Sequence, residues 1–463
     1  MQHETSSRII KRMRVKFRHI PCYLGNFASM VAEFGGAFGE IRSVQVGKDY
    51  KIRDIDITVR NEEIFDQICD ATRRLEGVDL IEVKDVVEEV HRGGKIEVTA
   101  TVDVKSVDDL RIVYTPGVAS VCRKIAKNPE LRYEFTSIPN NVAIVTNGTA
   151  ILGLGDIGPV AGMPVMEGKA LLFKLLAGIN GFPILIDSKD PEVIVATVKA
   201  IAKTFGAIKL EDIKAPECFE IEDKLDAALD IPVVHDDQHG TAVVVLAALI
   251  NIAKLTYINL RRSSVGIVGL GAAGSGIAKL LSAYGVNQLH GADINEEMSR
   301  RFKELGGEAM NLQQVMERSD IVIATTGVPG LIAPEWVRPK QVILALSNPD
   351  PEITPEAAMA AGARYSADGK SVNNALAFPG LFKGALMARA RRVNNAMKIA
   401  AAQTIASFAE GEDLIPDILN KEVHAAVAKA VEQAALKTGV AKTLDPDSVG
   451  AAYLANAAIG SKG

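Results

Sequence analysis

Apolar and polar residues alternate with two different periods along the first 85 residues. Met13, Val15 and Phe17 alternate with basic residues, which predicts a strand with one buried face. Apolar residues then recur at helical spacing from 24 to 34, and the glycine pair that follows can end that helix. The same reasoning predicts three further strands, at 44–46, 55–59 and 78–83, and a second helix at 64–75.

This order of elements, βαββαβ, is that of a ferredoxin-like sandwich. It resembles the ACT domain, a small regulatory module often attached to metabolic enzymes. The resemblance implies a binding site for a small-molecule effector, and a role only in dimerisation is the alternative. The turn from Pro21 to Gly25 departs from the Pro-Gly usual in the ligand loop of that family, so amino-acid binding is not expected to carry over.

The rest of the chain alternates strand-like and helix-like runs, which predicts α/β architecture. The segment 85–109 is acidic and contains Gly93-Gly94, which is typical of a linker. The run 238–255 predicts one long helix that joins two catalytic domains. We therefore expect an ACT-like domain at 1–90, a substrate domain at 91–238 and a Rossmann-type nucleotide domain with C-terminal helices at 239–463.

Composition narrows the class of protein. At 463 residues the chain is long enough for two or three domains, and its net charge of −5 gives no reason to expect nucleic acid. The most apolar run, 242–250, is about half of the ~18 residues that suggest a membrane span. No apolar signal segment follows Met1, and the four cysteines form no C-x-x-C pair. These features favour a cytoplasmic protein with free thiols.

Two segments match the dinucleotide-binding pattern G-x-G-x-x-G. In the second, IVGLGAAG, the strand-like run 265–268 comes before the loop and the helix-like run 275–283 follows it. Asp293 stands nineteen residues after the third glycine, where an acid binds the ribose 2′-hydroxyl. This context predicts a nucleotide loop at Gly269, Gly271, Ala272, Ala273 and Gly274.

The first match, ILGLGDIG at 151–158, lacks that context. Pro159 and Pro164 follow it, so no helix is expected to open on its third glycine. The next acid at a strand end, Asp187, comes 29 residues after Gly158. We therefore expect these glycines to allow a different close approach of the backbone.

Four carboxylates form the candidate metal site. Glu211, Asp212, Asp236 and Asp237 offer only oxygen, which suits Mg²⁺ or Mn²⁺. The alternative is zinc on His235 and His239, spaced i, i+4. That zinc motif requires Glu after the first histidine, whereas Asp236 stands here, and the helix is expected to begin only near Gln238.

Eight motifs occur in the order found in malic enzymes, and the resemblance runs from about Gly94 to the C-terminus. It is closest to the shorter bacterial type. The motifs are YTPGVA, LGLGDIGP, PVMEGKA, LEDI, HDDQHGTA, GLGAAGSG, LSNPDPEI and NNALAFPG.

The resemblance implies roles for individual residues. Lys169 would be the general base and Tyr114 the general acid. Glu211, Asp212 and Asp237 would bind the metal, with Asp236 beside them as a further catalytic residue. The remaining assignments place Asn348 on the nicotinamide side, Asn374 against malate and the loop around Gly155 in the malate pocket.

One position departs from the family. Larger malic enzymes have an Arg before this loop that grips a malate carboxylate, whereas this chain has Ala150. The second carboxylate of malate must therefore find another partner.

Elementary chemistry is consistent with these roles. Oxidising a 2-hydroxy acid requires a base for the hydroxyl proton, and burial beside a cation lowers the pKa of a lysine. A divalent cation stabilises the enolate that remains after CO₂ leaves, and an acid must then protonate C3.

The sequence therefore predicts oxidative decarboxylation of (S)-malate to pyruvate with Mg²⁺ or Mn²⁺. NAD is expected over NADP, because the charge of Asp293 would repel a 2′-phosphate. The alternatives are a malolactic enzyme, an amino-acid dehydrogenase and a non-catalytic nucleotide sensor. We expect a homodimer or a larger homo-oligomer, with no nucleic-acid or membrane partner.

Overall fold

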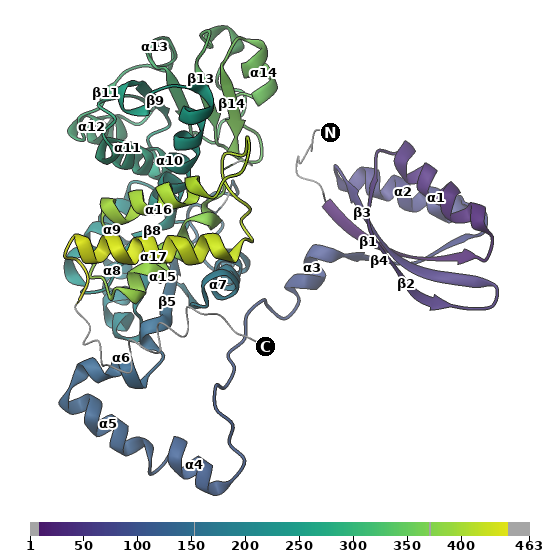
Figure 1. Ribbon diagram of the computed structural model, residues 1–463. Coiled ribbons are helices and arrows are strands. Elements are labelled where there is room, and N and C mark those ends of the chain that lie inside the picture. Colours follow the sequence, from purple (N-terminus) through teal and green to yellow (C-terminus); the bar gives the residue numbers. More distant parts are fainter. Residues whose placement is uncertain (1–8, 152, 370–371, 443–463) are drawn as a thin grey trace. The chain divides into compact units, whose positions relative to one another are not determined.

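The computed structural model describes residues 9–151, 153–369 and 372–442. The chain divides into two compact units, 1–97 and 98–463. The first unit contains one sheet and the second contains two (Figure 1).

The first unit is a four-stranded antiparallel sheet with the strand order β2-β3-β1-β4. The expected βαββαβ order is confirmed, although the strands are longer than the patterns predicted. The elements are β1 (Ile9–Arg18), α1 (Pro21–Glu33), β2 (Ala37–Val46), β3 (Tyr50–Val59), α2 (Glu62–Arg74) and β4 (Val78–Asp85).

One face of this sheet carries the core of the unit. Met13, Val15, Ile55 and Ile57 are fully buried and pack with Phe27 of α1. The boundary between the two units, after residue 97, lies within the segment 85–109 that was expected as linker and lead-in. Val86–His91 form a helix, α3, whose first turn is capped by the side chain of Asp85.

The first sheet of the second unit is parallel, with the order β6-β5-β7-β8. Three short helices precede it: α4 (Val107–Val113), α5 (Val118–Lys127) and α6 (Arg132–Phe135). The sheet and its crossover helices are β5 (Asn141–Thr146), α7 (Met163–Ala177), β6 (Asn180–Leu185), α8 (Pro191–Ile201), β7 (Ala207–Leu210), α9 (Glu217–Ala228) and β8 (Val233–His235).

The second sheet is parallel with the order β11-β10-β9-β12-β13-β14, which is the 3-2-1-4-5-6 order of a Rossmann fold. Its elements are β9 (Ser264–Val268), α11 (Ala272–Tyr284), β10 (Gln288–Ala292), α12 (Glu296–Glu304), β11 (Glu308–Ala309), α13 (Leu312–Arg318), β12 (Ile321–Ala324), β13 (Val342–Ala345), α14 (Pro355–Ala360) and β14 (Tyr365–Asp368).

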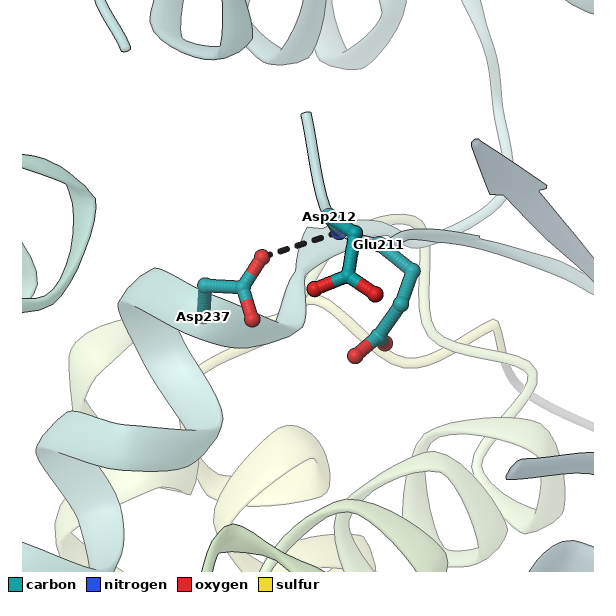
Figure 2. A group of neighbouring side chains, drawn as sticks. All are labelled: Glu211, Asp212 and Asp237. Carbon is teal, nitrogen blue, oxygen red and sulfur yellow. Dashed lines mark hydrogen bonds between the residues drawn. The ribbon is translucent and has the colours of Figure 1, made fainter. Parts of the chain in front are cut away.

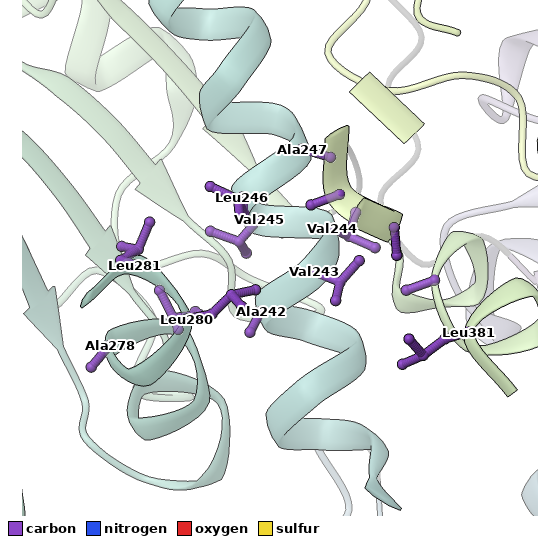
Figure 3. Close-up of a cluster of buried hydrophobic side chains, with 14 of the residues drawn as sticks. Ala242, Val243, Val244, Val245, Leu246, Ala247, Ala278, Leu280, Leu281 and Leu381 are labelled. Carbon is purple, nitrogen blue, oxygen red and sulfur yellow. The ribbon is translucent and has the colours of Figure 1, made fainter. Parts of the chain in front are cut away.

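The long helix α10 (Asp236–Thr256) joins the two sheets. It begins two residues earlier than expected, because Asp236 and Asp237 occupy its first turn, where negative charge is favourable. Figure 3 shows its apolar residues 242–247 beside α11. By length and composition α10 could cross a membrane, yet 67% of its most apolar window is buried within the fold.

The described part of the second unit also contains α15 (Phe378–Met387), α16 (Asn395–Ser407) and α17 (Lys421–Lys437). Helix α15 returns to the first sheet. The rings of Phe378 and Phe382 pack edge-on against Phe173 of α7, with centroids 4.9 and 5.3 Å away. The segment just before α15 is therefore fixed close to the carboxyl edge of that sheet.

Candidate functional site

The four acids of the candidate site follow two neighbouring strands. Glu211 and Asp212 come directly after β7, and Asp236 and Asp237 come directly after β8. Because parallel neighbours end at the same edge of a sheet, the fold brings these acids together at the carboxyl ends of the strands, the side on which open α/β sheets bind ligands.

Glu211, Asp212 and Asp237 form one cluster of oxygen atoms (Figure 2). One carboxylate oxygen of each lies within 4.8 Å of the others. Asp237 Oδ2 accepts a hydrogen bond from the Asp212 amide at 3.0 Å, which fixes the distance between the two strands' ends. Asp212 Oδ2 is buried without a hydrogen-bond partner. This donor set fits Mg²⁺ or Mn²⁺.

The electrostatics of Asp212 reflect the crowding of acids. Burial, and then the charge of Asp237, raise the pKa of Asp212 to about 7. The backbone of Asp212 is also left-handed, with φ of 51°, and such conformations cluster at functional sites. A cation bound here would replace a proton that the cluster otherwise holds near neutral pH.

Lys169 on α7 lies beside the same acids. Its Nζ is 2.9 Å from Glu211 Oε1, 3.1 Å from Asp236 Oδ2 and 3.3 Å from Asn374 Oδ1. Its side chain is 11% exposed, so it stays partly open to solvent while three polar groups fix its position.

A second lysine, Lys209, was missed in the sequence. It lies within β7, is fully buried and contacts Glu211, and its Nζ is 3.0 Å from Asp236 Oδ2. Burial lowers the pKa of Lys209 to about 8, although Asp236 opposes this shift. One feature of the sequence could have indicated it: a lysine stands in an apolar, strand-like run two residues before Glu211. Lysine is rarely found at a fully buried position.

Asp236 lies between these two lysines. Burial alone would raise the pKa of Asp236, but Lys209 and Lys169 outweigh it and hold this pKa below its usual range. With all groups ionised, four carboxylates and two ammonium groups leave two negative charges. A divalent cation would balance them.

The glycines of the first loop, Gly153, Gly155 and Gly158, all have positive φ, whereas the closest backbone approach is made by Gly148, just before the loop. A β-carbon at Gly148 would lie 2.2 Å from the backbone of Gly158. One at Gly153 would lie 3.4 Å from the backbone oxygen of Asn348, which follows β13 of the nucleotide sheet. Gly155 has φ of 74° and pairs through its backbone with Ile151. The loop therefore spans from the acid cluster to the second sheet.

Two other positions border the cluster. The Ala150 amide donates to the Asp212 carbonyl at 3.0 Å, so the residue that replaces the family's arginine lies next to a candidate ligand. On α10, a β-carbon at Gly240 would lie 2.2 Å from Asp236 Oδ1 and 3.6 Å from Asn374 Cβ. Glycine at 240 thus leaves room for the carboxylate of Asp236.

Tyr114 is not brought to the cluster. It ends α4 and is 65% exposed, and its hydroxyl has no hydrogen-bond partner among the described residues. No residue of α4 or α5 is buried. The segment 98–118 also exposes apolar side chains, among them Val98, Val107 and Ile112 at 91%, 67% and 72%.

The second glycine loop has the geometry of a phosphate loop. Gly269 has φ of 89°, and a β-carbon at Gly274 would lie 1.9 Å from the Gly269 oxygen. Helix α11 begins at Ala272 rather than at the expected 275, so the amides of Ala272 and Ala273 belong to its first turn, after Gly271 as the N-cap.

Asp293 follows β10, as expected, and is held by its own loop. One carboxylate oxygen accepts from the Leu270 amide at 2.6 Å and the other from the Asn295 amide at 2.8 Å. This places a fixed negative charge at the mouth of the phosphate loop, where a ribose would lie.

The two histidines of the zinc alternative have different surroundings. His239 contacts Glu222 at 3.0 Å through Nε2 and Lys398 at 2.9 Å through Nδ1, so both ring nitrogens are used within the fold. His235 is the N-cap of α10, and its Nε2 lies 3.5 Å from Asp237. The pair does not form a zinc site with the described acids.

Comparison with protein families matches most of the second unit. Residues 93–226 match the malic enzyme N-terminal domain, and residues 292–436 match the malic enzyme NAD binding domain. Residues 239–328 also match the NAD binding domain of D-isomer specific 2-hydroxyacid dehydrogenases.

Individual relatives agree. NAD-dependent malic enzyme 1 of Bacillus subtilis is 52% identical over 92% of this chain and 98% of that protein. A bifunctional malic/malolactic enzyme of the same organism is 44% identical over 77% of this chain and 93% of that protein. The crystal structure of malic enzyme from Pyrococcus horikoshii superposes with a TM-score of 0.73 at 41% identity, covering 79% of this chain and 92% of that one.

Proposed function

The chain belongs to the malic enzyme family, and we propose that the lysine–carboxylate cluster at the edge of its first sheet is where it acts on malate. The reaction is oxidative decarboxylation of (S)-malate to pyruvate and CO₂ with reduction of NAD, and it depends on a divalent cation. One arrangement supports the site above all. Lys169 Nζ lies 2.9 Å from Glu211, a member of the only acid cluster in the described residues with metal-ligand spacing.

Glu211, Asp212 and Asp237 are proposed to hold the metal. When bound, Mg²⁺ or Mn²⁺ would supply a Lewis acid for the oxygens of the substrate. The protein holds the three carboxylates close together and largely shielded from water. A hard cation is therefore expected to bind them in preference to staying hydrated in bulk solvent.

Lys169 is proposed to accept the hydroxyl proton of malate as the C2 hydride leaves. Asp236 and Asn374 hold its Nζ in place, at 3.1 and 3.3 Å. A base must lie within hydrogen-bond reach of the proton it takes, and a fixed, partly exposed Nζ beside the proposed metal ligands supports this role. Lys209 also contacts Asp236 and lowers the pKa of that carboxyl, which favours its ionised form.

Tyr114 is proposed to protonate C3 of the enolate that remains after CO₂ leaves. Its exposure is compatible with this role only if the segment 98–118 is covered in the assembled protein. We therefore propose a homo-oligomer in which the apolar side chains of this segment pack against a second copy of the chain.

The nucleotide is proposed to lie on the second sheet. The amides of Ala272 and Ala273 would face the pyrophosphate, Asp293 the ribose, and Asn348 the nicotinamide side next to the first glycine loop. Asn374 and the loop at Gly155 would contact malate. The charge of Asp293 favours NAD over NADP, and the Bacillus relative is likewise described as NAD-dependent.

Two further proposals concern the chain as a whole. The first unit has the βαββαβ topology of an ACT domain, which supports a regulatory role for it with a small-molecule effector. A cytoplasmic location is proposed because the cysteines are free and unpaired.

A spectrophotometric assay tests the activity. Malate and Mn²⁺ should yield pyruvate and free NADH, and kcat/KM should be higher with NAD than with NADP. A value about tenfold higher with NADP would contradict the cofactor choice. Lactate without free NADH would show a malolactic enzyme, which the bifunctional Bacillus relative makes the second candidate. No turnover at all would favour a nucleotide sensor.

A further inference from the structure

The sheet of the first unit carries two cations on its buried face. Side chains of a strand alternate between faces, so Lys51 and Arg53 share the face of Ile55 and Ile57, which are fully buried. The partners of these cations on β1 lie on the same face: Lys51 pairs with Phe17 and Arg53 with Val15. The open end of the core is therefore basic.

The acids of this sheet do not compensate these charges. Cations on the other face of β1 have close partners, since Arg12 lies 2.6 Å from Asp56 and Arg14 lies 2.7 Å from Asp54. Among residues 9–97, no carboxylate lies within ion-pair distance of Lys51, Arg53 or Arg18. Arg53 Nε is buried and has no hydrogen-bond partner. Buried donors are nearly always satisfied, so this one is open to a bound ligand or an ordered water.

A cavity lies at the same place. It has a volume of 270 Å³, close to the smallest ligand pockets, which begin at about 300 Å³. Phe17, Ile20 and Leu24 give it apolar walls, and Arg18, Lys51 and Arg53 contribute positive charge. Its composition suits a small molecule with an apolar portion and at least one anionic group.

We propose that this cavity binds a small organic anion through a carboxylate or a phosphate group, with Arg53 and Lys51 as its principal partners. A guanidinium pairs with either group through parallel N–H bonds. This assignment gives the chemistry of the effector proposed above and so rests on the regulatory role of the first unit. It does not depend on the catalytic cluster.

Calorimetric titration of the full chain with two probes, inorganic phosphate and succinate, tests the site. Arg53→Leu should weaken binding of at least one probe about tenfold or more, because a hydrogen bond to a charged group contributes about 1.5–3 kcal/mol. Lys51→Met should weaken the same probe. Arg74→Leu, an exposed arginine with no ion pair among the described residues, is the matched control and should bind as the wild type does. The probe that responds identifies the anionic group.

Thermal unfolding of the same variants separates a binding role from a structural one. Arg53→Leu should unfold at the wild-type temperature or above, because it removes a buried donor that has no partner. A lower unfolding temperature, or equal affinity in Arg53→Leu and Arg74→Leu, would contradict the proposal, as would a wild-type chain that binds neither probe. Binding with no effect on malate turnover would retain the site but remove its regulatory role. If the wild type and all three variants lacked malate turnover, the result would count against the catalytic proposal and not against this binding site.

Discussion

Lys169 depends on its neighbours for position. Nζ is held by Asp236 at the start of α10, Glu211 just after β7 and Asn374 in the segment before α15. Tyr114 has no such support in a single chain. The two residues should therefore fail differently when they are replaced.

Lys169→Ala and Tyr114→Phe are expected to block different steps. A general acid or base contributes typically ~10²–10⁴-fold, so both variants should lose most turnover. Lys169→Ala should stop oxidation of malate, whereas Tyr114→Phe should mainly prevent protonation at C3. Exchange of solvent deuterium into the methyl group of pyruvate, with Mn²⁺ and NADH present, isolates the second step and should collapse in Tyr114→Phe. Wild-type exchange in that variant would mean that Tyr114 is not the acid.

Lys398 should make stability depend on pH. Burial lowers the pKa of Lys398 to about 8, from 10.5 in an exposed lysine. Between these values the unfolded chain binds more protons, so this lysine destabilises the fold fully below pH 8 and progressively less up to 10.5. The stability of Lys398→Met relative to the wild type should therefore fall as pH rises from 8 to 10, by up to about 1.4 kcal/mol per pH unit.

Urea unfolding at several pH values measures this trend. Exposed Lys203→Met is the control and should show no such change. A stability difference between Lys398→Met and the wild type that is constant from pH 7 to 10 would contradict the expectation. Lys209 has the same sign of shift, so part of the wild-type slope should remain in the variant.

Strand and helix patterns predicted the elements more reliably than their ends. β3 was expected at 55–59 but begins at Tyr50, because Lys51 and Arg53 point inward and hide the apolar alternation. Lys209 was missed because the rest of its strand is apolar, so the strand was recognised while its single charged residue was overlooked. The order of the motifs along the chain identified Glu211, Asp212 and Asp237 as candidate metal ligands. It is the pairing of β7 with β8 that brings them together. His239 contacts Glu222 and Lys398 within the fold. The spacing of His235 and His239 in the sequence could not predict these contacts.

The segment containing α4 and α5 should behave as an assembly surface. Its apolar side chains are exposed in the single chain, and such patches mark interfaces. Ile112→Asp should shift the protein to a smaller species in light scattering and lower malate turnover as well, because Tyr114 lies on the same segment. Leu419→Asp places the same charge on an exposed apolar residue elsewhere and should leave the size unchanged. An Ile112→Asp protein of wild-type size would exclude this surface as the interface.

The whole molecule contains two units with separate cores, divided near residue 97. A shortened chain beginning near residue 90 should fold and keep malate turnover, because every proposed catalytic residue lies beyond that point. Response to an effector should be lost, and oligomer size is expected to change. Circular dichroism and the malate assay check this. A well-folded shortened chain without activity would show that the first unit contributes to catalysis directly.

Binding of Mn²⁺, followed by the paramagnetic resonance of the free ion, tests directly whether the three carboxylates hold the catalytic metal. The wild type should bind one ion per chain at the Glu211–Asp212–Asp237 cluster. Asp237→Asn should lose this ion and pyruvate formation together, whereas Asp223→Asn, an exposed acid on α9, should keep both. Wild-type Mn²⁺ affinity in Asp237→Asn, or undiminished turnover without the ion, would contradict the account.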